Sequence, residues 1–179
     1  AIVAAIALTL RRRKDSKYID PAEQVKVKRG DRLRVRGPQG AFVLQDNGNR
    51  PRCFVAGGTG LAPMLSMLRR MVEFGETQPA TLLFGVTSES NLFECSEITD
   101  LQAQLPQLKV DICVWKPGAG WSGFVGTPVD ALRQHLETTA AKPDIYLCGP
   151  PAMIDAAEKA AQAAGVPAAQ VYSERFLPT

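Results

Sequence analysis

The chain has 179 residues, a length expected of one domain or of one domain and part of a second. Hydrophobic residues make up 45% and charged residues 22%, which excludes a disordered, collagen-like or coiled-coil protein. The net charge is only +3, which gives no reason to expect a nucleic-acid partner. However, residues 1–36 hold 11 basic and 4 acidic groups, whereas residues 37–179 hold 10 and 14. This asymmetry predicts two differently built regions.

Residues 1–10 are nearly all apolar and are followed by a basic run, Arg11 to Lys14. Ten apolar residues are too few for a membrane-spanning helix, which needs ~20. A signal peptide has its basic residues before the apolar run. We therefore expect a buried strand and no membrane span, with the basic run in a solvated turn or, alternatively, against a ligand phosphate. Because the chain starts at alanine, we expect it to be a piece of a longer protein.

The cysteines are far apart in the sequence and His135 is the only histidine, so we expect no metal site in this chain. Three of the cysteines lie in apolar, strand-like runs, which is typical of buried thiols in a reducing compartment. We therefore expect a cytoplasmic protein. The four cysteines are Cys53, Cys95, Cys113 and Cys148.

A linker separates two patterns of predicted structure. Residues 33–36 alternate apolar and basic side chains and residues 41–44 are apolar, as in short strands. Residues 47–51 (NGNRP) are the strongest linker signal in the chain. We therefore predict a first region over residues 1–48 and a second domain over residues 49–179.

The second region alternates apolar strands with helices. The expected strands span residues 53–56, 81–86, 109–115, 145–148 and 170–176. The expected helices span residues 61–72, 92–105 and 151–164, and a further helix begins after a cap at Thr127. Residues 116–126 are expected to be a loop. This pattern predicts an α/β fold, a five-stranded parallel sheet with helices on both faces and a ligand crevice at the carboxyl ends of the strands.

Two turns at those strand ends carry the candidate chemistry. The first is Gly57, Gly58, Thr59, Gly60, Leu61, Ala62 and Pro63. Glycines let a phosphate approach the backbone, and a helix that begins there offers free N–H groups to an anion. The second turn is Cys148, Gly149, Pro150 and Pro151. Its thiol ends a strand that faces the same crevice, although a buried cysteine is more often inert packing.

These turns, in this order and with a terminal YSERF, resemble the ferredoxin–NADP reductase superfamily. Within it, the chain is similar to NADH-dependent reductase components of bacterial multicomponent oxygenases, above all the methane monooxygenase (component C) and phenol or toluene hydroxylase reductases. RVRGPQGAF, FVAGGTGLAPMLSMLRRM, LLFGV and DIYLCGPPAMIDAA extend the resemblance over roughly 150 residues. It implies that the chain passes a hydride from NADH to FAD, which feeds electrons through a [2Fe–2S] centre to an oxygenase.

The resemblance also implies roles for individual residues. Gly57 to Pro63 would hold the NADH pyrophosphate and the nicotinamide ribose, and Cys148 to Pro151 would lie against the nicotinamide. Cys148, Glu174 and Phe176 are the implied catalytic residues, the last two reaching toward the flavin. The implied cofactor-binding set also includes Met153, Ser16, Gly37 and Pro38.

The flavin half of the pattern is incomplete. Residues 1–48 resemble the C-terminal part of an antiparallel flavin-binding barrel, whose Arg-x-Tyr-Ser motif does not occur in the chain. Ser16 alone remains of the later Gly-x-x-Ser turn, with Arg13 in the glycine position. We do not expect this chain alone to bind FAD tightly. The [2Fe–2S] centre would belong to a missing or separate ferredoxin-type domain, and the partner would be the hydroxylase component of an oxygenase.

The adenosine end of NADH would lie past the second strand of the sheet, at Gly85, Thr87, Ser88 and Glu89. Glu89 would accept hydrogen bonds from the ribose hydroxyls and repel a 2′-phosphate, which would need Arg or Lys. No basic residue occurs between Arg70 and Lys109. We therefore expect NADH to be preferred over NADPH, with Lys116 the candidate for a basic residue from a distant loop.

Two other functions remain to be compared. A truncated module could bind NADH without turnover of its own. An ordinary Rossmann dehydrogenase is disfavoured, because Pro63 stands where the dinucleotide fingerprint requires Gly or Ala. For the remaining notable side chains we expect structural roles: Trp115 and Trp121 at the core edge, His135 exposed, and Glu94 and Glu97 on a solvent face.

Overall fold

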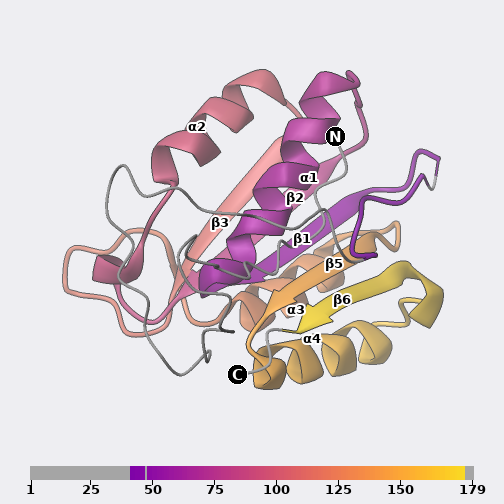
Figure 1. The fold of residues 1–179 in the computed structure, drawn as a ribbon. Coiled ribbons are helices and arrows are strands. Elements are labelled where there is room, and N and C mark those ends of the chain that lie inside the picture. Colours follow the sequence, from indigo (N-terminus) through magenta and orange to yellow (C-terminus); the bar gives the residue numbers. More distant parts are fainter. Residues whose placement is uncertain (1–40, 47, 176–179) are drawn as a thin grey trace, which may run out of the picture.

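The computed structural model describes residues 41–46 and 48–175 (Figure 1). Their core is a parallel sheet in the order β4-β3-β2-β1-β5-β6. The strands are β1 (Arg52–Gly57), β2 (Ala80–Val86), β3 (Leu108–Val114), β4 (Phe124–Val125), β5 (Asp144–Gly149) and β6 (Val171–Arg175). The helices are α1 (Leu61–Glu73), α2 (Cys95–Gln104), α3 (Pro128–Thr138) and α4 (Pro151–Ala163). The predicted α/β fold with a parallel sheet is confirmed.

The sheet has six strands where the sequence predicted five. The additional strand, β4, is two residues long and lies inside the segment predicted to be a loop. It pairs with the end of β3, Phe124 with Cys113 and Val125 with Val114. Two residues are too few to show a strand periodicity, so only the pairing with β3 reveals this strand.

Helices cover both faces of the sheet, as predicted. In Figure 1, α1 and α2 lie in front of the sheet and α3 and α4 lie behind it. Because side chains alternate along a strand, Phe54 and Tyr146 pack in the front core while Val55 and Leu147 pack in the rear core. Both faces of the central strands are therefore buried, which explains their unbroken apolar runs.

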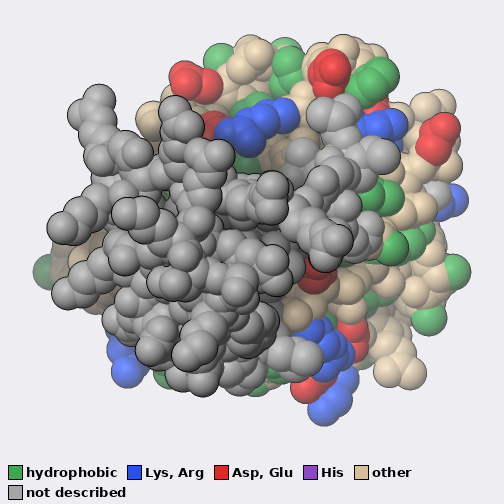
Figure 2. All heavy atoms as spheres, in the orientation of Figure 1, with side chains coloured by type: hydrophobic (Ala, Val, Ile, Leu, Met, Phe, Trp, Pro, Cys, Tyr) green, Lys and Arg blue, Asp and Glu red, His purple; other side chains and the backbone are tan. Residues whose placement is uncertain are grey.

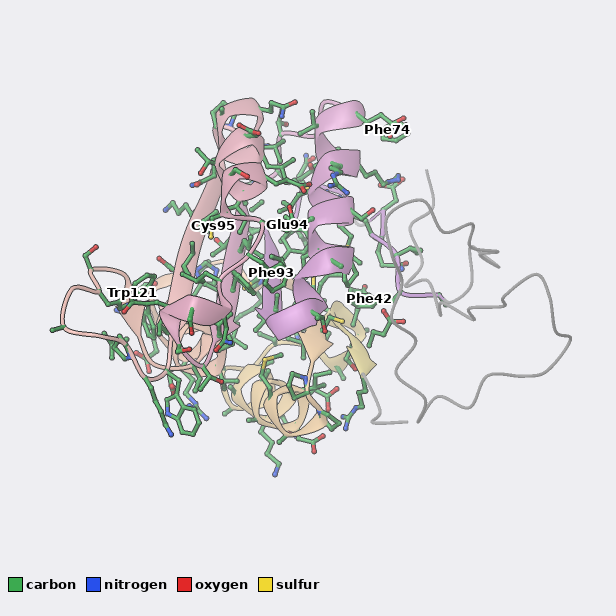
Figure 3. All side chains as sticks on the ribbon, turned by 60° about the vertical axis from the view of Figure 1, so that its left-hand side comes forward. Phe42, Phe74, Phe93, Glu94, Cys95 and Trp121 are labelled. Atoms are coloured by element: carbon green, nitrogen blue, oxygen red, sulfur yellow. The ribbon has the colours of Figure 1, made fainter. Side chains whose placement is uncertain are left out.

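The sequence located the start of α3 better than the start of α2. Thr127 caps α3 as expected, since its Oγ1 accepts a hydrogen bond of 3.2 Å from the Asp130 N–H. By contrast, α2 begins at Cys95 and not at residue 92. Glu94 has a φ of 55°, a left-handed conformation that cannot continue a helix upstream. Figure 3 shows Phe93, Glu94 and Cys95 where the chain enters α2.

Residues 41–46 pack against the front face of β5. Phe42 and Leu44 are buried in the front core, and the ring of Phe42 meets that of Tyr146 edge to face at 6.3 Å. The Gln45 N–H donates a hydrogen bond of 3.0 Å to Tyr146 Oη. This short segment is thus attached to the parallel domain, and the division of the chain at residue 48 stays a prediction.

Several predictions concern residues outside the described part of the chain. These are the strand over residues 1–10, the basic turn, and the implied flavin contacts of Ser16, Gly37, Pro38 and Phe176. Among the described helices, none is long and apolar enough to cross a membrane. On the face drawn in Figure 2, acidic and basic side chains of the described residues are interspersed with apolar ones.

Candidate nucleotide-binding site

A cleft of about 410 Å³ lies at the carboxyl ends of the strands, where the parallel sheet predicts a ligand crevice. Strands β5, β1, β2 and β3 each end at this cleft. Its lining residues are Gly57, Gly58, Gly85, Val86, Thr87, Asn91, Trp115, Thr127, Pro128, Pro150 and Met153. A larger surface cavity of about 670 Å³ lies between α4 and β6 and contains none of the predicted site residues. The strand-end cleft is therefore the candidate site.

The start of the first predicted turn, Gly57 and Gly58, forms the floor of the cleft. Gly57 ends β1, and Gly58 opens a short 3₁₀ turn with a φ of +54°, a conformation that glycine adopts without strain. Helix α1 follows directly, and no side chain caps its N-terminus. An uncapped helix N-terminus beside glycine backbone is the arrangement that favours an anion.

Not every residue of this turn reaches the cleft. The side chain of Leu61 is fully buried in the front core, and its N–H donates a hydrogen bond back within the turn, so it serves the fold. Pro63 is also buried, and it stands in the first turn of α1 where its missing N–H costs nothing. Thr59 and Ala62 are exposed outside the cleft lining. Of the seven predicted residues, only Gly57 and Gly58 line the cleft.

The two predicted turns are packed against each other. A β-carbon on Gly57 would lie 2.7 Å from Met153 Sδ, and one on Gly149 would lie 3.1 Å from the Gly57 nitrogen. Gly149 also has a φ of +154°. Met153 and Pro150 line the cleft beside this contact. The absence of side chains at both glycines is thus what lets the end of β5 and the end of β1 meet.

Cys148 and Glu174 lie side by side on neighbouring strands, since they are paired in the register of β5 and β6. Cys148 is fully buried in the front core and is not part of the cleft lining. Burial, together with the nearby Glu174 carboxylate, raises the pKa of the Cys148 thiol to about 12. Burial also raises the pKa of Glu174, whose Oε2 accepts no hydrogen bond from the described residues. The thiol is therefore neutral at physiological pH and can act by packing or as a weak donor.

The end of β2 forms the other wall of the cleft. Gly85 lets α3 approach, because a β-carbon there would lie 2.3 Å from Pro128 Cδ. Thr87 lines the cleft, whereas Ser88 and Glu89 do not. Glu89 points to the neighbouring loop, where its Oε1 accepts a hydrogen bond of 2.8 Å from the Gly118 N–H.

The sequence analysis did not place five of the cleft-lining residues in the site: Val86, Asn91, Trp115, Thr127 and Pro128. Asn91 and Trp115 are the two with the most distinctive side chains. Asn91 lines the cleft, and its Oδ1 accepts hydrogen bonds from the Ser88 N–H at 3.3 Å and the Ser88 hydroxyl at 2.8 Å. Trp115 also lines it and is 57% exposed, so its predicted place at the core edge is wrong. Trp115 directly follows β3, so the same strand-end rule that located the two turns could have found it.

The other side chains are distributed as follows. Trp121 is half-buried over Gly123 and donates a hydrogen bond of 3.1 Å from Nε1 to the Phe124 carbonyl oxygen. His135 is half-buried and not exposed as predicted, because it lies on α3 beside the core. Glu94 is exposed, whereas Glu97 is half-buried in an ion pair with Arg69. No three His, Cys, Asp or Glu residues of the described part lie close enough together to hold a metal ion.

A parallel sheet with helices on both faces and glycine turns at adjacent strand ends defines a nucleotide-binding α/β domain. Residues 54–159 match the oxidoreductase NAD-binding domain family, and the chain belongs to this family.

Individual relatives include components of oxygenase systems and a cytochrome P450 reductase. The chain is 46% identical over 114 residues to methane monooxygenase component C from Methylosinus trichosporium, a match that covers 64% of this chain and 34% of that protein. It is 35% identical over 149 residues to the toluate 1,2-dioxygenase electron transfer component from Pseudomonas putida, covering 82% and 43%. The structure of the Amycolatopsis cytochrome P450 reductase GcoB has a TM-score of 0.77 at 25% identity, over 85% of this chain and 46% of that one. The chain therefore spans less than half the length of these relatives.

Proposed function

We propose that the chain is the NADH-binding part of a reductase that delivers electrons to an oxygenase. The observation that carries this proposal is the contact between Gly57 and Gly149, which joins an anion-binding turn to a second turn at the end of β5. Relatives that are components of methane monooxygenase and toluate dioxygenase support it. So does the match to the NAD-binding domain family.

We place NADH along the cleft in one direction. Its pyrophosphate belongs at Gly57 and Gly58, where backbone amides and the N-terminus of α1 favour negative charge. The nicotinamide then lies toward Pro150 and Met153 at the end of β5. The adenosine lies toward Thr87 at the end of β2.

Hydride transfer needs little acid–base chemistry from the protein, so the residues act by orienting the nicotinamide and excluding water. Gly149 and Pro150 present backbone without a bulky side chain, and Met153 covers the cleft beside them. Cys148 supports this turn from below as a neutral thiol. Glu174 stands next to Cys148 in the register of β5 and β6 and, as the resemblance implies, would reach toward the flavin.

The hydride acceptor in this proposal is FAD, which the resemblance implies and which supplies the two-electron to one-electron conversion when bound. The chain's own implied flavin contacts at Ser16, Gly37 and Pro38 lie outside the described residues, so no step is assigned to them. A [2Fe–2S] centre on a ferredoxin-type domain and the hydroxylase component of an oxygenase are the proposed onward partners.

The proposal is tested by titrating NADH into the purified chain, with a matched pair of variants at Gly58. Asp and Asn have the same shape and both tolerate a positive φ better than most residues. A β-carbon at this position would meet no atom within 4 Å. Gly58→Asp adds a negative charge at the pyrophosphate and should abolish NADH binding. Gly58→Asn should weaken it far less.

Two results would contradict the proposal. One is the absence of saturable NADH binding to the wild-type chain, and the other is equal NADH affinity of the two variants. Circular dichroism of both variants checks that they are folded.

A further inference from the structure

Trp115 is a large aromatic side chain in a place that no packing role explains. It follows the last residue of β3, and its N–H donates a hydrogen bond of 3.1 Å to the Val86 carbonyl oxygen. Its side chain is 57% exposed and lines the cleft together with Gly58 and Thr87. A single exposed apolar residue needs no explanation. A tryptophan on the wall of a ligand cleft does, because aromatic rings are typical of such walls.

The surrounding loop holds the indole in place. The Lys116 N–H donates a hydrogen bond of 2.9 Å to the Thr87 carbonyl oxygen, which fixes the backbone directly after Trp115. Two residues on, the Gly118 N–H is bound by the Glu89 carboxylate. The Lys116 ammonium lies 4.7 Å from the centre of the indole ring, a cation–π contact that restrains the side chain. The ring is thus pre-positioned, so that a ligand stacking on it pays little ordering entropy.

The position of Trp115 along the cleft matches one part of a dinucleotide. The cleft runs across the ends of β5, β1, β2 and β3, and neighbouring strands are about 4.8 Å apart. Trp115 is therefore two strands, about 10 Å, from the glycine turn that receives the pyrophosphate, on the side away from Pro150 and Met153. A pyrophosphate at Gly57 and Gly58 leaves the ribose near Thr87 and brings the base to Trp115.

We infer that Trp115 is the platform on which the adenine of NADH stacks. This inference rests on the proposed function, because the direction of the dinucleotide follows from it. Stacking of a base on an aromatic side chain contributes about 1–3 kcal/mol, so loss of the ring weakens binding at least tenfold. The effect is confined to ligands that contain adenine.

The chain contains only two tryptophans, which makes the test direct. In Trp121→Phe, Trp115 is the only tryptophan fluorophore, and Trp121 lies outside the cleft lining. Adding 5′-AMP to this variant should quench the tryptophan fluorescence with a saturable curve. In the opposite variant, Trp115→Leu, calorimetry should give at least tenfold weaker binding of both 5′-AMP and NADH. Trp115→Phe, which keeps an aromatic ring, should restore part of the affinity.

Reduced nicotinamide mononucleotide is the control ligand, since it lacks adenine. Its affinity should be the same in the wild-type chain and in Trp115→Leu. If NADH binds the wild-type chain but Trp115→Leu leaves the affinities for NADH and 5′-AMP unchanged, the adenine platform is wrong while the proposed function stands. If NADH does not bind the wild-type chain, the proposed function is wrong, and the adenine platform that rests on it is wrong as well. Because Trp115 is exposed, Trp115→Leu should unfold at the wild-type temperature, which separates lost stacking from lost folding.

Discussion

Gly60 lies so close to Cys148 that a β-carbon on the glycine would be 2.1 Å from the carbonyl oxygen of the cysteine. The two residues are 88 positions apart in the sequence, in the turn after β1 and at the end of β5. Because a β-carbon would overlap this backbone oxygen, no side chain fits at position 60. The geometry of the cleft floor therefore depends on glycine at position 60.

We predict that Gly60→Ala lowers the free energy of unfolding by about 1–3 kcal/mol, the usual cost of forcing extra atoms into a packed site. It should also weaken NADH binding, because the two turns must separate. Gly120→Ala is the matched control, since a β-carbon on Gly120 would meet nothing within 4 Å. Chemical denaturation of the three proteins measures the difference. Equal stability of Gly60→Ala and Gly120→Ala would show that the turn rearranges freely.

Cys148 is the second target. In a full-length, flavin-containing protein, Cys148→Ala should slow flavin reduction by NADH at least tenfold, which corresponds to ~1.4 kcal/mol of barrier. The thiol pKa of about 12 means that the thiol stays neutral, so the wild-type rate should show no thiol ionisation between pH 6 and pH 9. Single-turnover stopped-flow absorbance gives both quantities. An unchanged rate in Cys148→Ala would reduce the residue to core packing.

The four cysteines should differ sharply in reactivity. Cys95 is exposed at the start of α2, whereas Cys53, Cys113 and Cys148 are buried. Burial raises the pKa of each of these three thiols to about 12, which removes the reactive thiolate at neutral pH. We expect iodoacetamide to label Cys95 first in the native chain, as measured by peptide mass spectrometry. All four should react in denaturant, and labelling of Cys148 at the rate of Cys95 would contradict the described packing.

His135 predicts a pH dependence of stability. Burial is the main cause that lowers its pKa below the usual 6.5, while Asp111 raises it and Lys109 lowers it. The unfolded chain therefore binds a proton more readily, and the free energy of unfolding falls as the pH drops below about 6.5 toward the lower pKa of the folded state. Above that range both states are neutral and the contribution is constant. Denaturation of wild type and His135→Gln from pH 5 to pH 8 should show the difference converging above pH 7. Parallel curves throughout would mean that His135 titrates equally in both states.

The choice between NADH and NADPH is predicted to depend on Glu89. The Lys116 ammonium lies over the Trp115 ring, and the Glu89 carboxylate lies beyond the end of β2, where a 2′-phosphate would meet its negative charge. We expect NADH to bind at least tenfold more tightly than NADPH at equal ionic strength. Glu89→Arg should narrow this gap.

A neutral variant distinguishes the charge of Glu89 from its contact with Gly118. Glu89→Gln keeps an oxygen that can accept the Gly118 N–H but removes the charge. It should raise the affinity for NADPH and leave the affinity for NADH unchanged. Calorimetric titration of both dinucleotides measures the gap, and equal or tighter binding of NADPH by the wild-type chain would refute the prediction.

The sequence alone determined the fold class, the family resemblance and the order of the main elements. These features follow from local patterns. Apolar runs indicate buried strands, apolar residues spaced three and four positions apart indicate α1, and Thr127 with Asp130 forms a helix cap. The two turns were also found from sequence, because glycine and proline directly after an apolar run determine the local backbone conformation and so indicate a turn. The positive φ values of Gly58 and Gly149 agree with that interpretation.

Only the tertiary structure decided which residues share the cleft. Trp115 and Asn91 lie far from Gly57 in the sequence, and they line the same cleft because the parallel strands end at one edge of the sheet. Conversely, Leu61 belongs to the glycine motif yet serves the core, and Glu89 is bound by a backbone amide 29 residues away. Whether a side chain faces ligand, core or loop depends on contacts between distant elements. Periodicity along a single element shows which of its faces is apolar, but not which distant residues lie against that face.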